Sequence, residues 1–196
     1  DSGNAITMAD GTLIDAGAGV IALSTAGAGG LGGGITLGGL LTTNATESAV
    51  TLTTDADVID GGESLTDVTA ATGRLVISAG TGIGVAGASG ALETTVASAD
   101  ITNAASGGID ITESDDLTVV NLANAAAGGS IAVRTTDGSL FLDAAAPIST
   151  NAGDLTLDTN GAGRGIVLMQ ATAITTGEDT AGDIRFADST PIDSDA

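Results

Sequence analysis

The chain has 196 residues, of which 25 are acidic, 4 are basic and none is histidine or cysteine, so its formal net charge is −21. Nucleic acid is excluded as a partner, because phosphate contacts require clustered cations. Disulfides, zinc sites built on cysteine or histidine and Ser-His-Asp catalysis are excluded by the missing residue types. No apolar run approaches the roughly 20 residues of a membrane span.

The apolar residues are small. They make up 42% of the chain, but aromatic residues are only 1%, namely Phe141 and Phe186. A wide core needs large side chains to fill it, so this composition favours a thin core between sheets that lie close together. The 31 glycines fit many tight turns between short strands.

A short phrase returns along the chain: a small residue, two or three alternating apolar positions, and a small polar turn. Alternation with a period of two predicts short strands, and a unit that recurs at a nearly fixed spacing usually stacks on its neighbours. The phrase therefore predicts an all-β fold, a parallel β-solenoid (β-helix). Its copies lie at 3–8, 19–23, 33–37, 48–52, 74–77, 107–111, 129–133, 153–157 and 182–186.

The first half of the chain is the less regular half. Its anchors Ile6, Ile21, Ile35 and Val50 fall about 15 residues apart, which leaves open two-sided coils or alternate faces of larger coils. The glycine tract 27–34 predicts a turn. The stretch 86–106, with Ala-Leu-Glu-Thr-Thr-Val-Ala-Ser, is expected to be a loop or a short helix.

The second half divides into sets of three short strands, each set about 22 to 29 residues long, the length of a three-sided coil. About eight such coils, stacked at roughly 4.8 Å each, give a rod near 40 Å long. Six residues are expected to line one inner face: Ile109, Ile111, Ile131, Val133, Leu155 and Leu157. The sets are 109–111, 117–120 and 121–124; 131–133, 140–142 and 147–149; 155–157, 166–168 and 173–175; and 184–186, which begins a fourth.

An antiparallel sandwich is the rival fold. Asp137-Gly138 lies between two alternating segments, which is a strong hairpin signal, and Asp10-Gly11 is similar. The scarcity of aromatic residues and the repeated sets of three favour the solenoid.

Asp55, Asp57, Asp60 and Glu63 are the metal candidates, with calcium as the possible cofactor. Calcium takes six to eight oxygens from closely spaced carboxylates and carbonyls on a bent backbone. The EF-hand pattern fails, because Ile59 stands at its third ligand position. A solvated turn is the alternative. The run 113–116, Glu-Ser-Asp-Asp, is a second acidic candidate, and paired strands rather than a metal are expected to hold the coils.

No catalytic residues are assigned, and the chain is expected not to be an enzyme. A polysaccharide-active enzyme is the remaining catalytic alternative, because many solenoids act on polysaccharides through paired carboxylates. The carboxylates here are so scattered that chance proximity is expected. Asn44-Ala45-Thr46 is an N-glycosylation sequon, which makes Asn44 the candidate modification site.

Several phrases resemble very large bacterial surface proteins built of β-strand repeats, similar in style to adhesins of the filamentous-haemagglutinin type. The phrases lie at 11–19, 81–87, 91–103 and 107–120. The resemblance implies an extracellular or cell-surface parallel β-solenoid that forms part of a giant secreted chain, a fibre or a biofilm.

Residues 1–196 are interpreted as one solenoid segment, one period of a longer array. The predicted function is that of a structural repeat unit that stacks end to end on copies of itself in an extracellular fibre, surface layer or giant adhesin. A module that binds surface glycans is the alternative. Acidic residues meet where two segments would join: Asp1, Asp188, Asp193 and Asp195.

Overall fold

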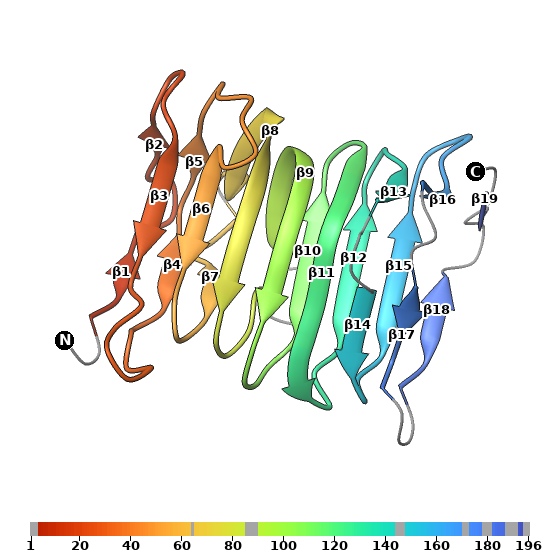
Figure 1. Ribbon diagram of the computed structural model, residues 1–196. Coiled ribbons are helices and arrows are strands. Elements are labelled where there is room, and N and C mark those ends of the chain that lie inside the picture. The colour runs from red at the N-terminus through yellow and green to blue at the C-terminus, as the bar shows by residue number, and fades with distance from the viewer. Residues whose placement is uncertain are drawn as a thin grey trace.

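The computed structural model describes residues 4–63, 65–84, 90–143, 148–169, 173–177 and 182–186, with the backbone of 192–193. This part of the chain consists of strands and contains no helix (Figure 1). No described segment is a helix long and apolar enough to cross a membrane. The strands wind into a rod with β1 and β18 at its opposite ends (Figure 1), and the fold is the predicted parallel β-solenoid.

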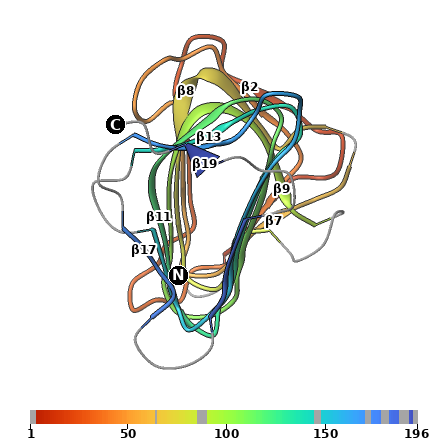
Figure 2. The same cartoon turned by 90° about the vertical axis from the view of Figure 1, so that its right-hand side faces the viewer.

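Three faces form the sides of each coil, as the view along the rod in Figure 2 shows. The first face continues through isolated bridges at Ile83, between β7 and β10. It contains β1 (Ile6–Thr7), β4 (Ile35–Leu37), β7 (Val58–Asp60), β10 (Ile109–Glu113), β12 (Ile131–Thr135), β15 (Leu155–Thr159) and β18 (Ile184–Phe186).

The second and third faces share three long strands that bend around one corner. These are β8 (Val68–Ala79), β9 (Leu92–Asn103) and β11 (Leu117–Ala127). The second face adds β2 (Ile14–Asp15), β5 (Leu40–Leu41), β13 (Leu140–Leu142), β16 (Ile166–Leu168) and β19 (Ile192–Asp193). The third adds β3 (Ile21–Ser24), β6 (Val50–Thr53), β14 (Ile148–Asn151) and β17 (Ile174–Thr175).

The rod has about six turns, fewer than the eight coils expected. Six residues of one ladder on the first face pair on both sides, whereas Ile6 and Ile184 at its ends pair on one side only among the described residues. The ladder runs Ile6, Ile35, Val58, Ile83, Ile109, Ile131, Leu155 and Ile184.

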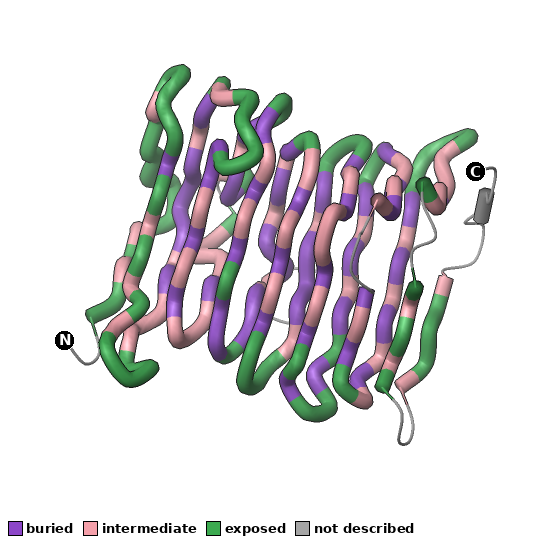
Figure 3. The backbone as a smooth tube through the Cα atoms, viewed as in Figure 1, coloured by how far each residue is buried: buried purple, intermediate pink, exposed green. Residues whose placement is uncertain are grey.

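The core is a set of aliphatic ladders, in which each side chain packs on its counterparts one coil away. Ile109 pairs with Ile131 and Ile131 with Leu155, and all three are fully buried. Buried and half-buried residues alternate along the strands, while exposed residues gather at the turns and the two ends (Figure 3). The predicted inner face is confirmed: Ile109, Ile111, Ile131, Val133, Leu155 and Leu157 are all buried.

Close approach of backbones explains why the repeated phrase so often begins with glycine. At the turn that leads from the third face back to the first, a Cβ on Gly129 would overlap the carbonyl oxygen of Gly107. A Cβ on Gly153 would overlap that of Gly129, and one on Gly182 that of Gly153. We call these four residues the glycine corner. Only glycine lets the coils stack at strand spacing there.

The same turn is closed by polar side chains that point inward. Thr150 Oγ1 donates to the carbonyl oxygen of Gly153 at 2.5 Å, and Thr176 Oγ1 donates to that of Gly182 at 2.9 Å. Two coils use asparagine instead: Asn103 Nδ2 donates to Asn124 Oδ1 at 3.0 Å, and both side chains are buried. The two threonine bonds satisfy carbonyls that the turn would otherwise leave buried without a partner.

The stretch 86–106 differs from the expectation drawn from the sequence. It is neither loop nor short helix: residues 92–103 form β9, which bridges β8 and β11 and also pairs with β10 through Leu92 and Ile111. Residues 86–89 lie outside the described part. The sequence misleads because several inward positions of β9 hold small or polar residues, among them Thr94 and Ala99.

Two alternatives left open by the sequence are settled by the pairing. Ile6 pairs with Ile35 and Ile21 with Val50, so the 15-residue spacing reflects alternate faces of three-sided coils. Asp137-Gly138 turns a corner instead of closing a hairpin: β12 pairs with β10 and β15, and β13 pairs with β11 and β16, all in parallel.

Candidate functional site

The four acidic residues singled out as metal candidates lie at separate positions. Asp55 Oδ2 accepts hydrogen bonds from the backbone N–H groups of Gly27 and Gly32, at 2.8 and 3.0 Å, and so fixes the glycine turn of another coil. Asp57 follows in the same turn, and its carbonyl oxygen accepts from Ile35 N at 2.8 Å. Glu63 is exposed. Asp60 alone of the four belongs to the group described next.

Asp60, Asp67 and Glu93 form an acidic triad, in which one carboxylate oxygen of each residue lies within 4.8 Å of the other two. Asp60 ends β7, Asp67 precedes β8, and Glu93 lies on β9, one coil farther along. The parallel register of β8 and β9 sets Val68 beside Thr94 and so brings Asp67 and Glu93 together. Glu93 N donates to Asp67 Oδ2 at 2.9 Å.

Burial and the neighbouring carboxylates raise the pKa of Asp67 and of Glu93. Burial, opposed by the hydrogen bond from Glu93 N and aided by the Asp60 and Glu93 carboxylates, raises the pKa of Asp67 to about 8. Burial, followed by the charges of Asp60 and Glu63, also raises the pKa of Glu93. Three carboxylates that repel one another in a low-dielectric setting need a proton or a cation.

Glu113, from the second acidic run, is a separate buried carboxylate. Its Oε2 accepts from Thr94 Oγ1 at 2.8 Å and from Val96 N at 3.2 Å, and its Oε1 accepts from Ser114 N at 2.9 Å. The side chain thus takes the place of a backbone carbonyl at the corner between β10 and β11. Glu113 has a structural role at this corner.

The stability of the fold is expected to depend on the protonation of Glu113. Burial, aided by the nearby Asp115 and opposed by the bonds from Thr94, Val96 and Asp115 N, raises its pKa from 4.5 to about 7. The folded protein therefore holds this proton more tightly than the unfolded chain. The resulting stabilisation, about 3 kcal/mol, is complete below about pH 4.5 and is lost as the pH rises through about 7.

Urea unfolding of the wild type and of Glu113→Gln between pH 4.5 and 8 measures this effect. The wild type should lose stability across that window, and the variant, which cannot ionise, should lose about 3 kcal/mol less. Equal slopes in the two proteins would contradict the assignment.

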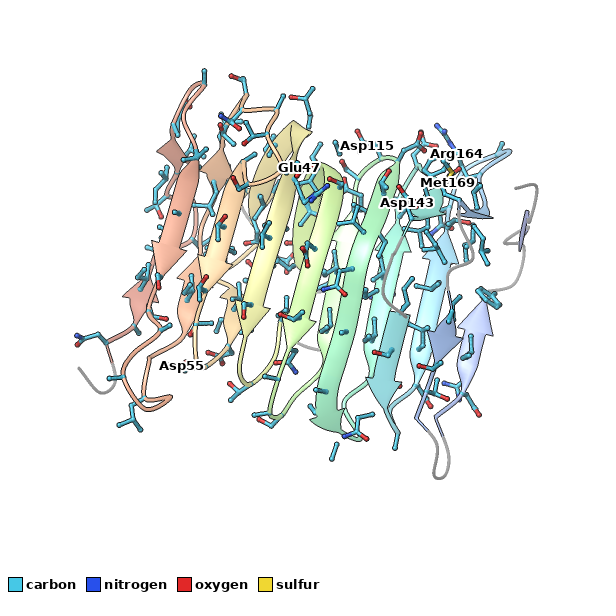
Figure 4. The ribbon with its side chains drawn as sticks, viewed as in Figure 1. Glu47, Asp55, Asp115, Asp143, Arg164 and Met169 are labelled. Atoms are coloured by element: carbon cyan, nitrogen blue, oxygen red, sulfur yellow. The ribbon has the colours of Figure 1, made fainter. Side chains whose placement is uncertain are left out.

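A shallow groove lies beside the turns that join the first face to the second. Its volume is about 340 Å³, and its lining includes Asp115, Asp116, Phe141 and Arg164. Arg164 bridges coils, with Nη1 at 3.3 Å from Asp116 Oδ1 and Nε at 3.6 Å from Asp137 Oδ1. Figure 4 shows Asp115 and Arg164 along one edge of the rod, opposite the edge that carries Asp55. One half-buried aromatic ring is not the stripe that favours glycan stacking, so a glycan partner stays a prediction.

Asn44 lies in the turn between β5 and β6. Its Oδ1 accepts from Thr46 N at 2.9 Å, and its Nδ2, the atom that glycosylation would modify, donates to the Ala18 carbonyl at 3.0 Å. Glycosylation at Asn44 stays a prediction.

Comparison with known proteins adds no relative. No protein-family model matches the chain, and no match is found among curated proteins or solved structures. The geometry of the solenoid is therefore the basis on which a function is inferred.

Proposed function

We propose that this chain is a structural repeat unit that stacks end to end and builds a fibre or surface layer outside the cell. The observation that carries the proposal is the contrast between end coils and inner coils. Ile14 and Ile184, in the end coils, are 38% and 41% exposed, whereas their ladder neighbours Leu40 and Leu155 are 0% exposed. These two end rungs have aliphatic character without the cover that their inner neighbours have, although Ile21, on the end strand β3, is 5% exposed.

The backbone edges support the same proposal. Each of β1, β2 and β3 pairs with only one described strand, as β18 does at the other end. Unpaired strand edges template further pairing. A rung such as Ile6 placed on Ile184 would continue the aliphatic ladder of the first face. Among the acids expected at such a junction, Asp1, Asp188 and the Asp193 and Asp195 side chains lie outside the described part.

The arrangement of the charged side chains favours a structural role over a catalytic one. The arginines are taken up in ion pairs that link coils, such as Arg134 with Asp110 and Arg74 with Glu47 at 3.5 Å. Most copies of the repeated phrase supply the aliphatic ladders and the tight corners, and both features stack one coil on the next. We extend the proposal to an extracellular setting and an adhesive role, because the repeated phrases resemble those of large bacterial surface proteins.

Self-association of the purified 196-residue chain should rise with ionic strength. Two ends of a chain with a net charge of −21 repel each other, and salt shortens the range of this repulsion to about 3 Å at 1 M. Sedimentation velocity at 20 mM and 500 mM NaCl should show a shift from monomers towards rods of increasing length.

Substitutions at the ends separate stacking from other association. The pair Ile14→Asp and Ile184→Asp places like charges where the ends meet and should keep the chain monomeric at both salt concentrations. Thr51→Asp adds a charge on the lateral surface and should leave association unchanged. A wild type that stays monomeric in all conditions, or equal loss of association in both variants, would refute end-to-end stacking.

A further inference from the structure

The acidic triad has the form of a binding site, because two of its oxygens have no hydrogen-bond partner. Asp67 is 0% exposed, and among the described residues its Oδ1 accepts no hydrogen bond; the buried Oε2 of Glu93 has none either. A buried carboxylate oxygen without a partner is costly. Asn103 Oδ1 is the one other buried side-chain oxygen without a partner among the described residues, and it belongs to a neutral amide. The two unsatisfied oxygens of Asp67 and Glu93 belong to one acidic cluster, and they therefore point to a ligand that supplies positive charge.

No side chain of this protein can supply that charge. The chain has no histidine, and its basic residues are four arginines. Each of them is engaged with other carboxylates: Arg74 with Glu47, Arg134 with Asp110, Arg164 with Asp116 and Asp137, and Arg185 with Asp154 and Asp183.

We propose that Asp60, Asp67 and Glu93 bind one calcium ion, which joins the coil of β7 and β8 to the coil of β9. Calcium–oxygen distances of about 2.3 to 2.6 Å make the coordination sphere about 4.6 to 5.2 Å across, and three oxygens within 4.8 Å of one another fit on it. Water and the exposed Glu63 carboxylate, whose charge acts on Glu93, are available for the remaining positions.

The position of the site gives the ion a structural task. In the coil of β9 the first face is reduced to isolated bridges, Val58 with Ile83 and Ile83 with Ile109. The triad lies next to this sparse region, with Asp60 and Asp67 on the preceding coil and Glu93 on the coil of β9 itself. A bound ion therefore reinforces the first of the two junctions, Val58 with Ile83, at which the first face is joined by an isolated bridge.

Calorimetric titration of CaCl2 into the EDTA-treated 196-residue chain, at pH 7.5 in 150 mM NaCl, tests the proposal. One saturable site per chain is expected. Asp67→Asn and Glu93→Gln should each weaken binding at least tenfold, and MgCl2 should bind at least tenfold more weakly than CaCl2, because Mg²⁺ demands a smaller octahedral shell. Calcium should also raise the thermal midpoint of the wild type, followed by circular dichroism, but not that of Asp67→Asn.

Asp115→Asn is the matched control, since it removes an exposed acidic charge outside the triad, and it should bind within twofold of the wild type. Equal weakening in the control and the triad variants would show diffuse binding to an acidic surface and overturn the site. Absence of saturable calcium binding to the wild type would overturn the proposal and would mean that the triad shares a proton instead of binding a cation. Equal affinity for Mg²⁺ would overturn the choice of calcium. If Asp67→Asn does not fold, Glu93→Gln decides the same question.

Discussion

Gly153→Ala is expected to lower the free energy of unfolding by about 3 kcal/mol and to loosen the coils that follow it. The added Cβ would overlap the Gly129 carbonyl, and Gly129 in turn stacks so closely on Gly107 that a Cβ there would overlap the Gly107 carbonyl. The strain therefore falls on backbone atoms, which have no rotamer to change. Repeat proteins are stabilised mainly by neighbour contacts, so the loss should stay local to the altered junction.

Urea unfolding combined with hydrogen exchange measures both parts of this prediction. Amide protection should fall in β15 and β18, which lie beyond the altered turn, and persist in β6 and β8. Gly19→Ala is the matched control, because its Cβ would meet its nearest neighbour, the Ala16 carbonyl oxygen, at 3.1 Å in an exposed turn. A Gly153→Ala protein as stable as the control would mean that the coils are not stacked as described.

Asn124→Ala is expected to cost about 4 kcal/mol, because one buried side chain makes four hydrogen bonds. Its Oδ1 accepts from Asn103 Nδ2 at 3.0 Å and from Ala126 N at 3.1 Å. Its Nδ2 donates to the carbonyls of Gly107 and Ser130 at 3.1 and 3.3 Å. The substitution removes bonds in two successive turns of the glycine corner and leaves the buried Ala126 N without its acceptor. The carbonyls of Gly107 and Ser130 each keep one donor, Asn103 Nδ2 and Ile109 N.

Asn151→Ala is the control for this substitution. Asn151 is the exposed asparagine that ends β14 in the next coil, and its Nδ2 makes one bond, to the Ala125 carbonyl at 3.0 Å. Its loss should cost about 1 kcal/mol or less. Thermal unfolding followed by circular dichroism compares the two variants, and midpoints within a degree of each other would contradict the role given to Asn124.

The fold could be predicted from sequence wherever inward positions hold Ile, Val or Leu. In β12 and β15 the period of two is unbroken, and the predicted segments 131–133 and 155–157 lie within the observed strands Ile131–Thr135 and Leu155–Thr159. In β9 the inward Thr94 and Ala99 weaken that signal, and only the partners β8 and β11 make the segment a strand. Tertiary pairing there outweighs local pattern, as is usual for strands.

The candidate site could be predicted only in part. Asp60 stands out because acidic residues surround it in sequence, but its partners come from outside that run. The signal that could have found them is the coil spacing: Asp67 and Glu93 are 26 residues apart, close to one coil length, and lie one coil apart in the parallel register. Glu113 carried a signal as well, since it continues the alternation of Ile109 and Ile111 and therefore points inward.

Electron cryomicroscopy of the 196-residue chain at 500 mM NaCl tests the central claim most directly, because it shows whether coils continue from one copy to the next. We predict unbranched rods of constant width, with a repeat of about 4.8 Å along the axis and parallel strand pairing that runs from the Ile184 rung of one copy to the Ile6 rung of the next. Single particles of one fixed length, or copies joined through their lateral faces, would contradict the account.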